Sequence, residues 1–393
     1  MIKILVLIDS ATEFSRRFLS GLVRYAHENG PWIFYRLPLY YKMLYGEEGV
    51  LEQIKEWGID AVIVQWEYRE IKFLKKLDIP VFLQNYEDNA DWFSKISGDY
   101  MEVGAIAANF FAQKRFKNFA FYGNKNFLWS KGRAEGYRIE VEKLGGNYYY
   151  FESEYLTNSQ WSRSHIKLNK WLSSLPKPVA VFACDDYFAL QVAEMCKINH
   201  IDIPNEISLL GVDNDELICN LSYPSISSIV TDDENIGYVA GKKLHKLIIN
   251  KKNIPFNIIK KPIRIEQRQS TEKYNIANKY ILKIIEHLEK NFASDLSIDE
   301  LTQMVPLGRR SLEKKFKEAM GTSIYQFIID KKIEFFSYKL LTTQESSLDI
   351  AIEAGFNDVR NAYRIFKKNT GHSPSVFRKK FSTRDKPPLS PTD

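Results

Sequence analysis

The sequence predicts an α/β core of two lobes, each a doubly wound parallel sheet, followed by an all-α domain with two helix-turn-helix units. Three observations support this prediction. Short apolar runs alternate with amphipathic helical stretches over residues 1–268. The apolar runs are nearly uninterrupted, as in strands that are buried on both faces of a parallel sheet. Beyond residue 276 the helical patterns continue, but no convincing strand pattern follows.

The alternation falls into two series. The predicted strands are Lys3–Ile8, Trp32–Leu37, Ala61–Val64, Val81–Leu83, Asn118–Tyr122, Asn147–Phe151, Val179–Ala183 and Ile207–Val212. Helical patterns lie between them, among them Phe14–Glu28, Ser130–Lys143, Trp161–Ser174 and Tyr187–His200. Strand–helix alternation builds parallel sheets, and there are too many strands for one small unit. Two similar lobes in series are therefore predicted.

The pattern changes define four segments. Residues 1–268 form the two-lobed core, and the polar stretch 269–275 is predicted to be a linker. Residues 276–383 form the helical domain. The last segment, 384–393, is rich in proline and is predicted to be disordered.

The charge is concentrated in the C-terminal third. The chain carries a net charge of +6, and residues 276–393 hold 20 basic and 15 acidic side chains. Local positive charge attracts the phosphate backbone of nucleic acids, although a solvated lysine-rich surface gives the same count.

The composition also favours a particular location for the protein. The chain has three cysteines and no CxxC pair, which favours a reducing compartment. This number and spacing argue against a disulfide framework and against a zinc site. No signal peptide and no apolar run of ~20 residues is evident, so a cytoplasmic protein without a membrane partner is expected.

The first helix-turn-helix pattern begins at Ser297. Ser297 and Glu300 form a capping-box pattern, which starts a short helix. Pro306 breaks this helix, and Gly308 opens a second one at Arg309–Met320. Short helix, tight turn and second helix outline a helix-turn-helix unit, although a plain helical hairpin has the same outline.

The outline repeats about 50 residues later, where a second short helix ends at Gly355. Asn357 or Asp358 is positioned to cap the helix that follows, Val359–Asn369. A long helix, Tyr325–Leu341, lies between the two units. One rigid helix between two recognition helices suits successive major grooves, which lie ~34 Å apart.

The segments Gly355-Phe356-Asn357-Asp358, Arg364-Ile365-Phe366-Lys367-Lys368 and Gly371-His372-Ser373-Pro374 resemble the AraC-type DNA-binding signature. The resemblance covers residues 276–383 and implies an operator in double-stranded DNA as the partner. The residues it implies for DNA contact are Arg309, Arg310, Glu313, Lys314, Arg360, Asn361, Arg364, Lys367 and Lys368. Arg and Asn suit guanine and adenine edges, whereas Lys367 and Lys368 suit phosphates. Pro306 stands where this family usually has Gly, and Arg360-Asn361-Ala362 replaces the usual Ser-aromatic-aromatic run.

Polar side chains follow the predicted strands of the core. Because ligands bind beyond the carboxyl ends of parallel strands, these side chains are candidates for a binding site. They are Asp9, Trp66, Glu67, Asn85, Asp99, Asp185, Asp186, Asp213, Asn214 and Asp215, with Phe14 and Trp129 as aromatic neighbours. Acceptors around an aromatic surface suit a sugar. Each Asp, taken alone, is better explained as the cap of the next helix, and only the convergence of several at one edge favours a binding site.

The core also resembles LacI-type regulators and other proteins with a periplasmic-binding fold. The resemblance rests on the stretches at residues 130–137, 182–190 and 203–214, and it spans Lys3–Arg268. Carried over by position, it implies that Arg133, Asp185 and Asp213 reach the effector, together with Asp99 and Arg16. Asp185 stands where this family usually has Asn.

The order of the two domains resembles that of bacterial activators of xylose operons. The resemblance implies D-xylose or a close pentose bound between the lobes, a homodimer, and RNA polymerase as a partner of an activator. Another pentose, a hexose or a non-sugar effector remains an alternative, as does a sugar-binding protein or enzyme without a DNA role. No P-loop, GxGxxG, G-x-S-x-G or HExxH motif occurs. Neither catalysis, a cofactor nor a metal is therefore expected.

Overall fold

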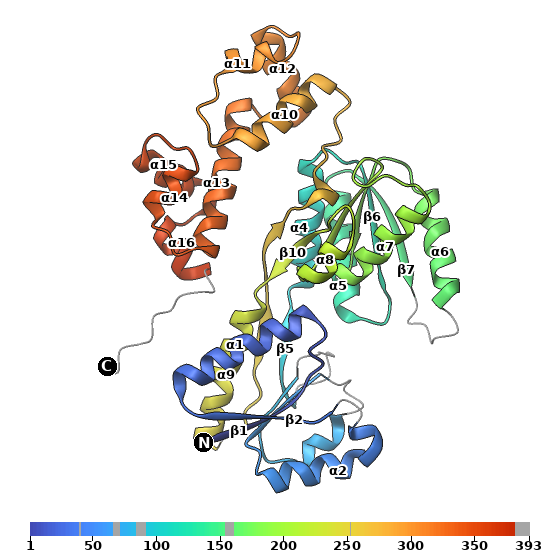
Figure 1. Cartoon of the computed structure of the whole chain (residues 1–393), viewed down its shortest axis with the longest axis vertical. Coiled ribbons are helices and arrows are strands. Elements are labelled where there is room, and N and C mark those ends of the chain that lie inside the picture. The colour runs from blue at the N-terminus through green and yellow to red at the C-terminus, as the bar shows by residue number, and fades with distance from the viewer. Residues whose placement is uncertain (39–40, 66–70, 84–91, 154–160, 252, 382–393) are drawn as a thin grey trace. The chain divides into compact units, whose positions relative to one another are not determined.

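The computed structural model describes residues 1–38, 41–65, 71–83, 92–153, 161–251 and 253–381. It divides into two compact units. The first contains residues 1–112 and 117–273, and the second contains residues 113–116 and 274–393. Figure 1 shows strands and helices in the first unit and helices in the second. The predicted fold class is confirmed.

The first unit holds two six-stranded sheets in its described residues, one in each lobe. The first sheet has the order β11 (Asn257–Lys260), β5 (Ser94–Gly98), β4 (Val81–Leu83), β3 (Ala61–Val64), β1 (Ile2–Leu7) and β2 (Trp32–Arg36). The second has the order β12 (Pro262–Glu266), β10 (Ser227–Thr231), β9 (Ile207–Val212), β8 (Val179–Ala183), β6 (Asn118–Asn124) and β7 (Asn147–Ser153). Neighbouring strands are parallel except for β10 and β12.

Helices connect and cover these strands (Figure 1). They are α1 (Glu13–Asn29), α2 (Tyr41–Trp57), η1 (Lys72–Lys76), α4 (Tyr100–Gln113), α5 (Leu128–Lys143), α6 (Trp161–Ser174), α7 (Asp186–Ile198), α8 (Glu216–Leu221), α9 (Asp233–Asn250) and η3 (Gln269–Thr271). Helices α1 and α9 touch backbone to backbone, because a Cβ at Gly21 would lie 1.7 Å from Glu234 O and one at Gly237 1.9 Å from Phe18 O. Glycine is required at both contacts.

The chain passes from one sheet to the other three times, after β5, β10 and β11. Backbone hydrogen bonds join the three passages. Asp99 N donates to Lys260 O at 3.0 Å, and Asp232 N donates to Lys261 O at 3.2 Å. Side chains far apart in sequence therefore meet where the lobes are joined.

All eight predicted strands are present, as is β5, the strand expected directly before Asp99, but β10, β11 and β12 were not predicted. Strand β10 begins with Ser227 and Ser228, which are fully buried yet polar. Their hydroxyls are hydrogen-bonded to Arg268 O and to Asp186 Oδ1. Hydrogen bonding of this kind permits polar residues inside a sheet, so the apolar pattern is missing from the sequence.

The second unit is helical in its described residues. Its helices are α10 (Lys279–Asn291), α11 (Ile298–Gln303), α12 (Arg309–Met320), α13 (Ile324–Thr342), α14 (Ser347–Glu353), α15 (Val359–Thr370) and α16 (Pro374–Phe381). One apolar core lies around Leu312 and Phe316, and a second lies around Ala362 and Phe366. No helix in the described part of the chain is long and apolar enough to cross a bilayer.

Candidate functional site

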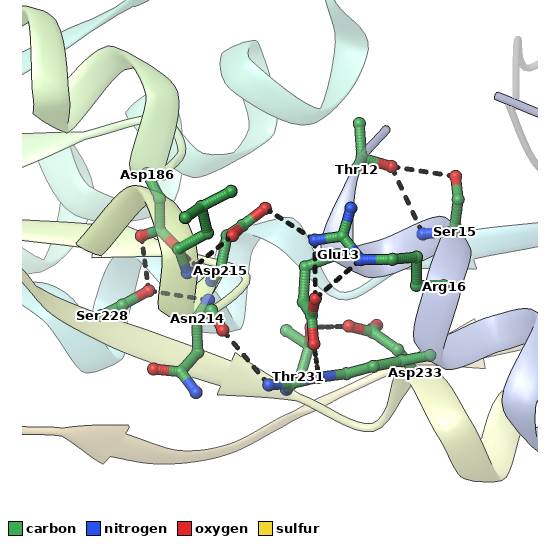
Figure 2. Close-up of polar contacts among 12 residues, drawn as sticks. Thr12, Glu13, Ser15, Arg16, Asp186, Asn214, Asp215, Ser228, Thr231 and Asp233 are labelled. Carbon is green, nitrogen blue, oxygen red and sulfur yellow. Dashed lines mark hydrogen bonds and ion pairs between the residues drawn. The ribbon is translucent and has the colours of Figure 1, made fainter. Parts of the chain in front are cut away.

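The loop that follows β9, residues 213–215, has an unusual backbone. Asp213 and Asn214 have φ angles of +94° and +50°, in the region that L residues rarely adopt. The amides of the loop are all bonded. They donate in order to Ile229 O at 2.9 Å, Ser228 Oγ at 2.9 Å and Asp186 Oδ2 at 2.7 Å. Figure 2 shows Ser228 between Asp186 and Asn214. The second sheet, which contains β9 and β10, thus holds a strained loop at the carboxyl ends of its strands.

Two cations contact the carboxylate of Asp213. Lys260 Nζ lies 3.0 Å and Arg133 Nη2 3.4 Å from Asp213 Oδ1. Burial alone would raise the pKa of Asp213, but Lys260 and Arg133 outweigh burial and hold this pKa below its ordinary value. Asp213 is therefore an ionised acceptor, suited to hydroxyl donors.

Arg133 is 3% exposed and lies on α5. Its guanidinium donates to the carbonyl of Cys184 at the end of β8 and lies 5.2 Å from the ring centre of Trp129. The resemblance to LacI-type regulators implied that Arg133 and Asp213 reach the same effector, and the structure brings the two side chains together. The role of this pair in effector binding stays a prediction.

Asp185 caps α7, because its Oδ1 accepts from Phe188 N at 2.8 Å. Burial raises its pKa to about 6, although bonds from the backbone partly offset this shift. The carboxyl group of Asp185 thus caps α7, and the same group is the one predicted to bind the effector. Asp186, its neighbour, is buried and supports the 213–215 loop.

Other candidate residues, Arg16 and Phe14, lie on α1, which follows β1 of the first sheet. Arg16 Nη2 contacts Glu13 at 2.8 Å and Asp215 at 3.4 Å, and Figure 2 shows it between them. The ring of Phe14 lies 4.1 Å from Lys260 Nζ. Arg16 and Phe14 are therefore brought to the same cluster as Asp213.

Asp9 and Asp99 make local contacts. Asp9 Oδ1 accepts from Ala11 N at 2.9 Å, and Asp99 Oδ1 accepts from Glu102 N at 3.2 Å. The backbone amide of Asp99 also donates a hydrogen bond to the carbonyl of Lys260. The candidates Trp66, Glu67 and Asn85 lie outside the described residues.

Lys260 was not among the binding-site residues predicted from the sequence. Its side chain is 10% exposed, and its Nζ bridges Asp213 and Asp233, at 3.0 Å from an Oδ1 of each. A lysine at the end of a short run, Asn257–Lys260, gives little signal by itself. A buried charge is recognised only when its partners are known.

Each helix-turn-helix unit is built as its caps predict. Ser297 and Glu300 form the capping box of α11, and Gly308 begins α12. Of the two candidate caps for α15, Asp358 is the one that accepts a bond, from Arg360 N at 2.9 Å.

The candidate DNA-contacting side chains lie away from the apolar cores. Those exposed to solvent are Arg309, Arg310, Glu313, Lys314, Arg360, Arg364, Lys367 and Lys368. Asn361 is half-buried and accepts from Arg364 Nη2 at 3.0 Å. In the described residues no group of three or more His, Cys, Asp or Glu is arranged to hold a metal ion.

Comparison with known proteins finds a family match within each unit. Residues 108–271 match the periplasmic binding protein-like domain, and residues 301–380 match a helix-turn-helix domain. The xylose operon regulatory protein of Haemophilus influenzae is 28% identical over 335 residues, which are 83% of this chain and 87% of that protein.

Two solved structures share the fold. The structure of the xylose-binding transcription activator XylR has a TM-score of 0.59 at 23% identity, covering 97% of this chain and 98% of that one. A periplasmic binding protein/LacI regulator from Alkaliphilus metalliredigens complexed with D-xylulofuranose has a TM-score of 0.53 at 19% identity, covering 69% and 98%.

A periplasmic binding protein-like core joined to a C-terminal AraC-type helix-turn-helix domain defines a DNA-binding transcription regulator. Within this class, the chain is a homologue of the xylose operon regulatory proteins.

Proposed function

We propose that this regulator is controlled by a monosaccharide, D-xylose in the first place, that binds to its core, and that it activates a sugar-catabolism operon. The observation that carries the proposal is the ionised Asp213 held between Arg133 and Lys260. Ordered donors and acceptors at the carboxyl edge of a parallel sheet suit a hydroxyl-rich ring. The names of the homologous regulators and of the matching sugar-bound structure favour a pentose.

The proposed roles follow from the chemistry of each side chain. Asp213 accepts hydroxyl protons, and Arg133 donates to adjacent hydroxyl oxygens. Asp185 gives a further carboxyl oxygen, and Phe14 and Trp66 give apolar surface. Asp9, Asp99 and Arg16 complete the predicted set.

The proposed control couples this site to DNA binding. An effector that prefers one arrangement of the lobes shifts the protein toward that arrangement. The exposed basic side chains of α12 and α15 bind two successive major grooves of an operator. A cytoplasmic homodimer that contacts RNA polymerase completes the proposal, without catalytic activity or cofactor.

The test is a thermal-shift and calorimetric screen with D-xylose, L-arabinose, D-ribose and D-glucose. A sugar at about 100 times its Kd adds about 2.7 kcal/mol, which raises the melting temperature by several degrees. Asp213→Asn abolishes this rise, whereas the control Glu194→Gln, exposed on α7, retains it. A rise with another sugar corrects the effector. The absence of a rise with any of the four rules out the proposed sugars, and an undiminished rise in Asp213→Asn rules out the site.

A further inference from the structure

The chain leaves the core through a turn that is buried against β9 and β10. Ser270 and Thr271 are fully buried. Ser270 Oγ donates to Leu209 O at 2.6 Å and accepts from Ser227 N at 2.8 Å. Ser227 Oγ lies 2.7 Å from Thr271 Oγ1. The residues that lead into the second unit at Tyr274 are thus fixed to the two strands that bracket the 213–215 loop.

Arg268 joins this turn to the loop. Its Nη2 donates to Asn214 Oδ1 at 2.8 Å, and its Nη1 donates to Ile226 O at 3.0 Å. Asn214 is 4% exposed and directly follows Asp213, the proposed effector acceptor. The guanidinium of Arg268, a residue at the end of the core, therefore contacts the loop with one nitrogen and the residue before β10 with the other.

The loop is also contacted from lobe 1 at each of its residues. Lys260 contacts Asp213 at 3.0 Å, Arg17 Nη2 donates to Asn214 O at 3.2 Å, and Arg16 contacts Asp215 at 3.4 Å. Figure 2 shows Asn214 and Asp215 of this loop between Arg16 and the Asp186–Ser228 pair. A ligand that changes the partners of Asp213 thus acts on a segment already held in a strained backbone.

A simpler role for Arg268 is to anchor the end of the core. The bonds of Arg268 N to Ser227 Oγ at 2.7 Å and of Arg268 Nη1 to Ile226 O already provide that anchor. The bond to the side chain of Asn214 is not needed for it. It reaches a residue of the loop that lies 54 positions earlier in the sequence.

We propose that Arg268 is a positioning residue that transmits the state of the 213–215 loop to the linker ahead of the DNA-binding helices. The inference rests on the proposed function, because it takes the loop to be the effector loop. When the partners of Asp213 change, the side chain of Asn214 moves, and Arg268 carries this movement to residues 268–273. Neither Arg268 nor Asn214 was a candidate for this role in the sequence analysis.

Hydrogen exchange of the whole chain tests this coupling. In the wild type, saturating D-xylose is expected to change exchange in residues 268–276 by about fivefold or more. Arg268→Met is expected to bind D-xylose with a Kd within about twofold of wild type, while the response of residues 268–276 is lost. The control Gln269→Ala changes the same turn, but it removes a contact to Ser225 and leaves the Arg268–Asn214 bond in place. This control is expected to keep the exchange response to D-xylose. An intact response in Arg268→Met overturns the proposal.

A second arm needs no sugar. Asn214→Gly retains a residue suited to the positive φ and removes only the acceptor of Arg268. Its exchange in residues 268–276 without ligand is expected to rise by about fivefold relative to Gln269→Ala. No rise overturns the coupling whatever the effector is. If D-xylose does not bind the wild type but this rise occurs, the proposed effector is wrong and the coupling stands.

Discussion

Two neighbouring carboxyl groups at the start of α7 have different duties. Asp185 caps the helix through Phe188 N, while Asp186 holds the 213–215 loop through Asp215 N. Burial raises the pKa of both, that of Asp185 to about 6. A group with a raised carboxyl pKa binds its proton more tightly in the folded than in the unfolded chain. Its contribution to stability is complete below the unfolded pKa and is lost as the pH rises through the folded value.

Asp185→Asn is therefore expected to flatten the fall in the free energy of unfolding between pH 4 and pH 6. Asn still caps a helix and carries no charge. A shift of about two units corresponds to at most about 3 kcal/mol, which solvent screening at this partly exposed site reduces to about 1 kcal/mol. Urea unfolding at both pH values measures the slope, with Glu194→Gln as the control. An unchanged slope in Asp185→Asn would show that the carboxyl titrates normally.

Lys260 balances two carboxylates at the passage between the sheets. Lys260→Met is expected to cost about 3 kcal/mol at pH 7.5, because Asp213 and Asp233 lose their shared cation. Burial then raises the pKa of both carboxyl groups, so the folded chain binds more protons than the unfolded one. The loss should shrink as the pH falls to 5.5. Urea unfolding at the two pH values measures it, and Lys242→Met, exposed on α9, is the control. Equal losses in both variants would contradict the ion-pair argument.

The sequence was sufficient to select Asp213, because it directly follows a predicted strand, whereas Arg133 was selected only through the resemblance of residues 130–137 to LacI-type regulators. It did not reveal Lys260 or Arg268. Lys260 becomes meaningful only through partners 27 and 47 positions away, Asp233 and Asp213. Arg268 was read as the last residue before a polar linker, yet it is hydrogen-bonded to the loop after β9. Contacts between distant segments, rather than local pattern, define both roles.

At the scale of elements, helix ends were well predicted because their signals are local. Ser297, Gly308 and Asp358 are the N-cap residues of α11, α12 and α15, as residue types favoured at that position. Strands β10 and β11 were missed because buried polar residues interrupt their apolar pattern. Ser227 and Ser228 in β10 and Lys260 in β11 are buried with hydrogen bonds or ion pairs to distant segments. The two glycines that end helical segments of the second helix-turn-helix unit, Gly355 and Gly371, differ in their surroundings. Both have positive φ, +78° and +75°.

Gly355→Ala is expected to destabilise the chain more than Gly371→Ala. A Cβ at Gly355 would lie 1.9 Å from Ala293 O, whereas none of the described atoms lies within 4 Å of a Cβ at Gly371. The backbone conformation alone costs about 1 kcal/mol in either variant, and the overlap at Gly355 adds about 1–3 kcal/mol. Chemical unfolding followed by circular dichroism measures the two losses. Equal losses would mean that the segment after α10 moves away at little cost.

At the scale of the whole molecule, the C-terminal segment and the rest of the chain differ in net charge. Residues 276–393 carry 20 basic and 15 acidic side chains, and the remaining residues carry 35 and 34. The excess positive charge therefore belongs to the unit that matches the helix-turn-helix domain. Arg364 lies near the middle of α15, whereas Lys367 and Lys368 lie in its last turn. These positions separate a side chain suited to base edges from side chains suited to phosphates.

Arg364→Ala and the pair Lys367→Gln with Lys368→Gln are therefore expected to weaken DNA binding in different ways. On a duplex selected from a random library, Arg364→Ala should lose about 1–3 kcal/mol, with little loss on a scrambled duplex. The lysine pair should lose affinity for both duplexes and reduce the salt slope by about two. Fluorescence anisotropy over a series of salt concentrations measures all of these quantities.

The exposed Lys242→Met in the core is the matched control, because it removes one positive charge from the other unit. If Arg364→Ala weakened both duplexes equally, Arg364 would be a phosphate contact. If it weakened neither, Arg364 would not contact the DNA, and α15 would contribute only through Lys367 and Lys368. The comparison thus shows whether the second helix-turn-helix unit reads the base sequence or only contacts the DNA backbone.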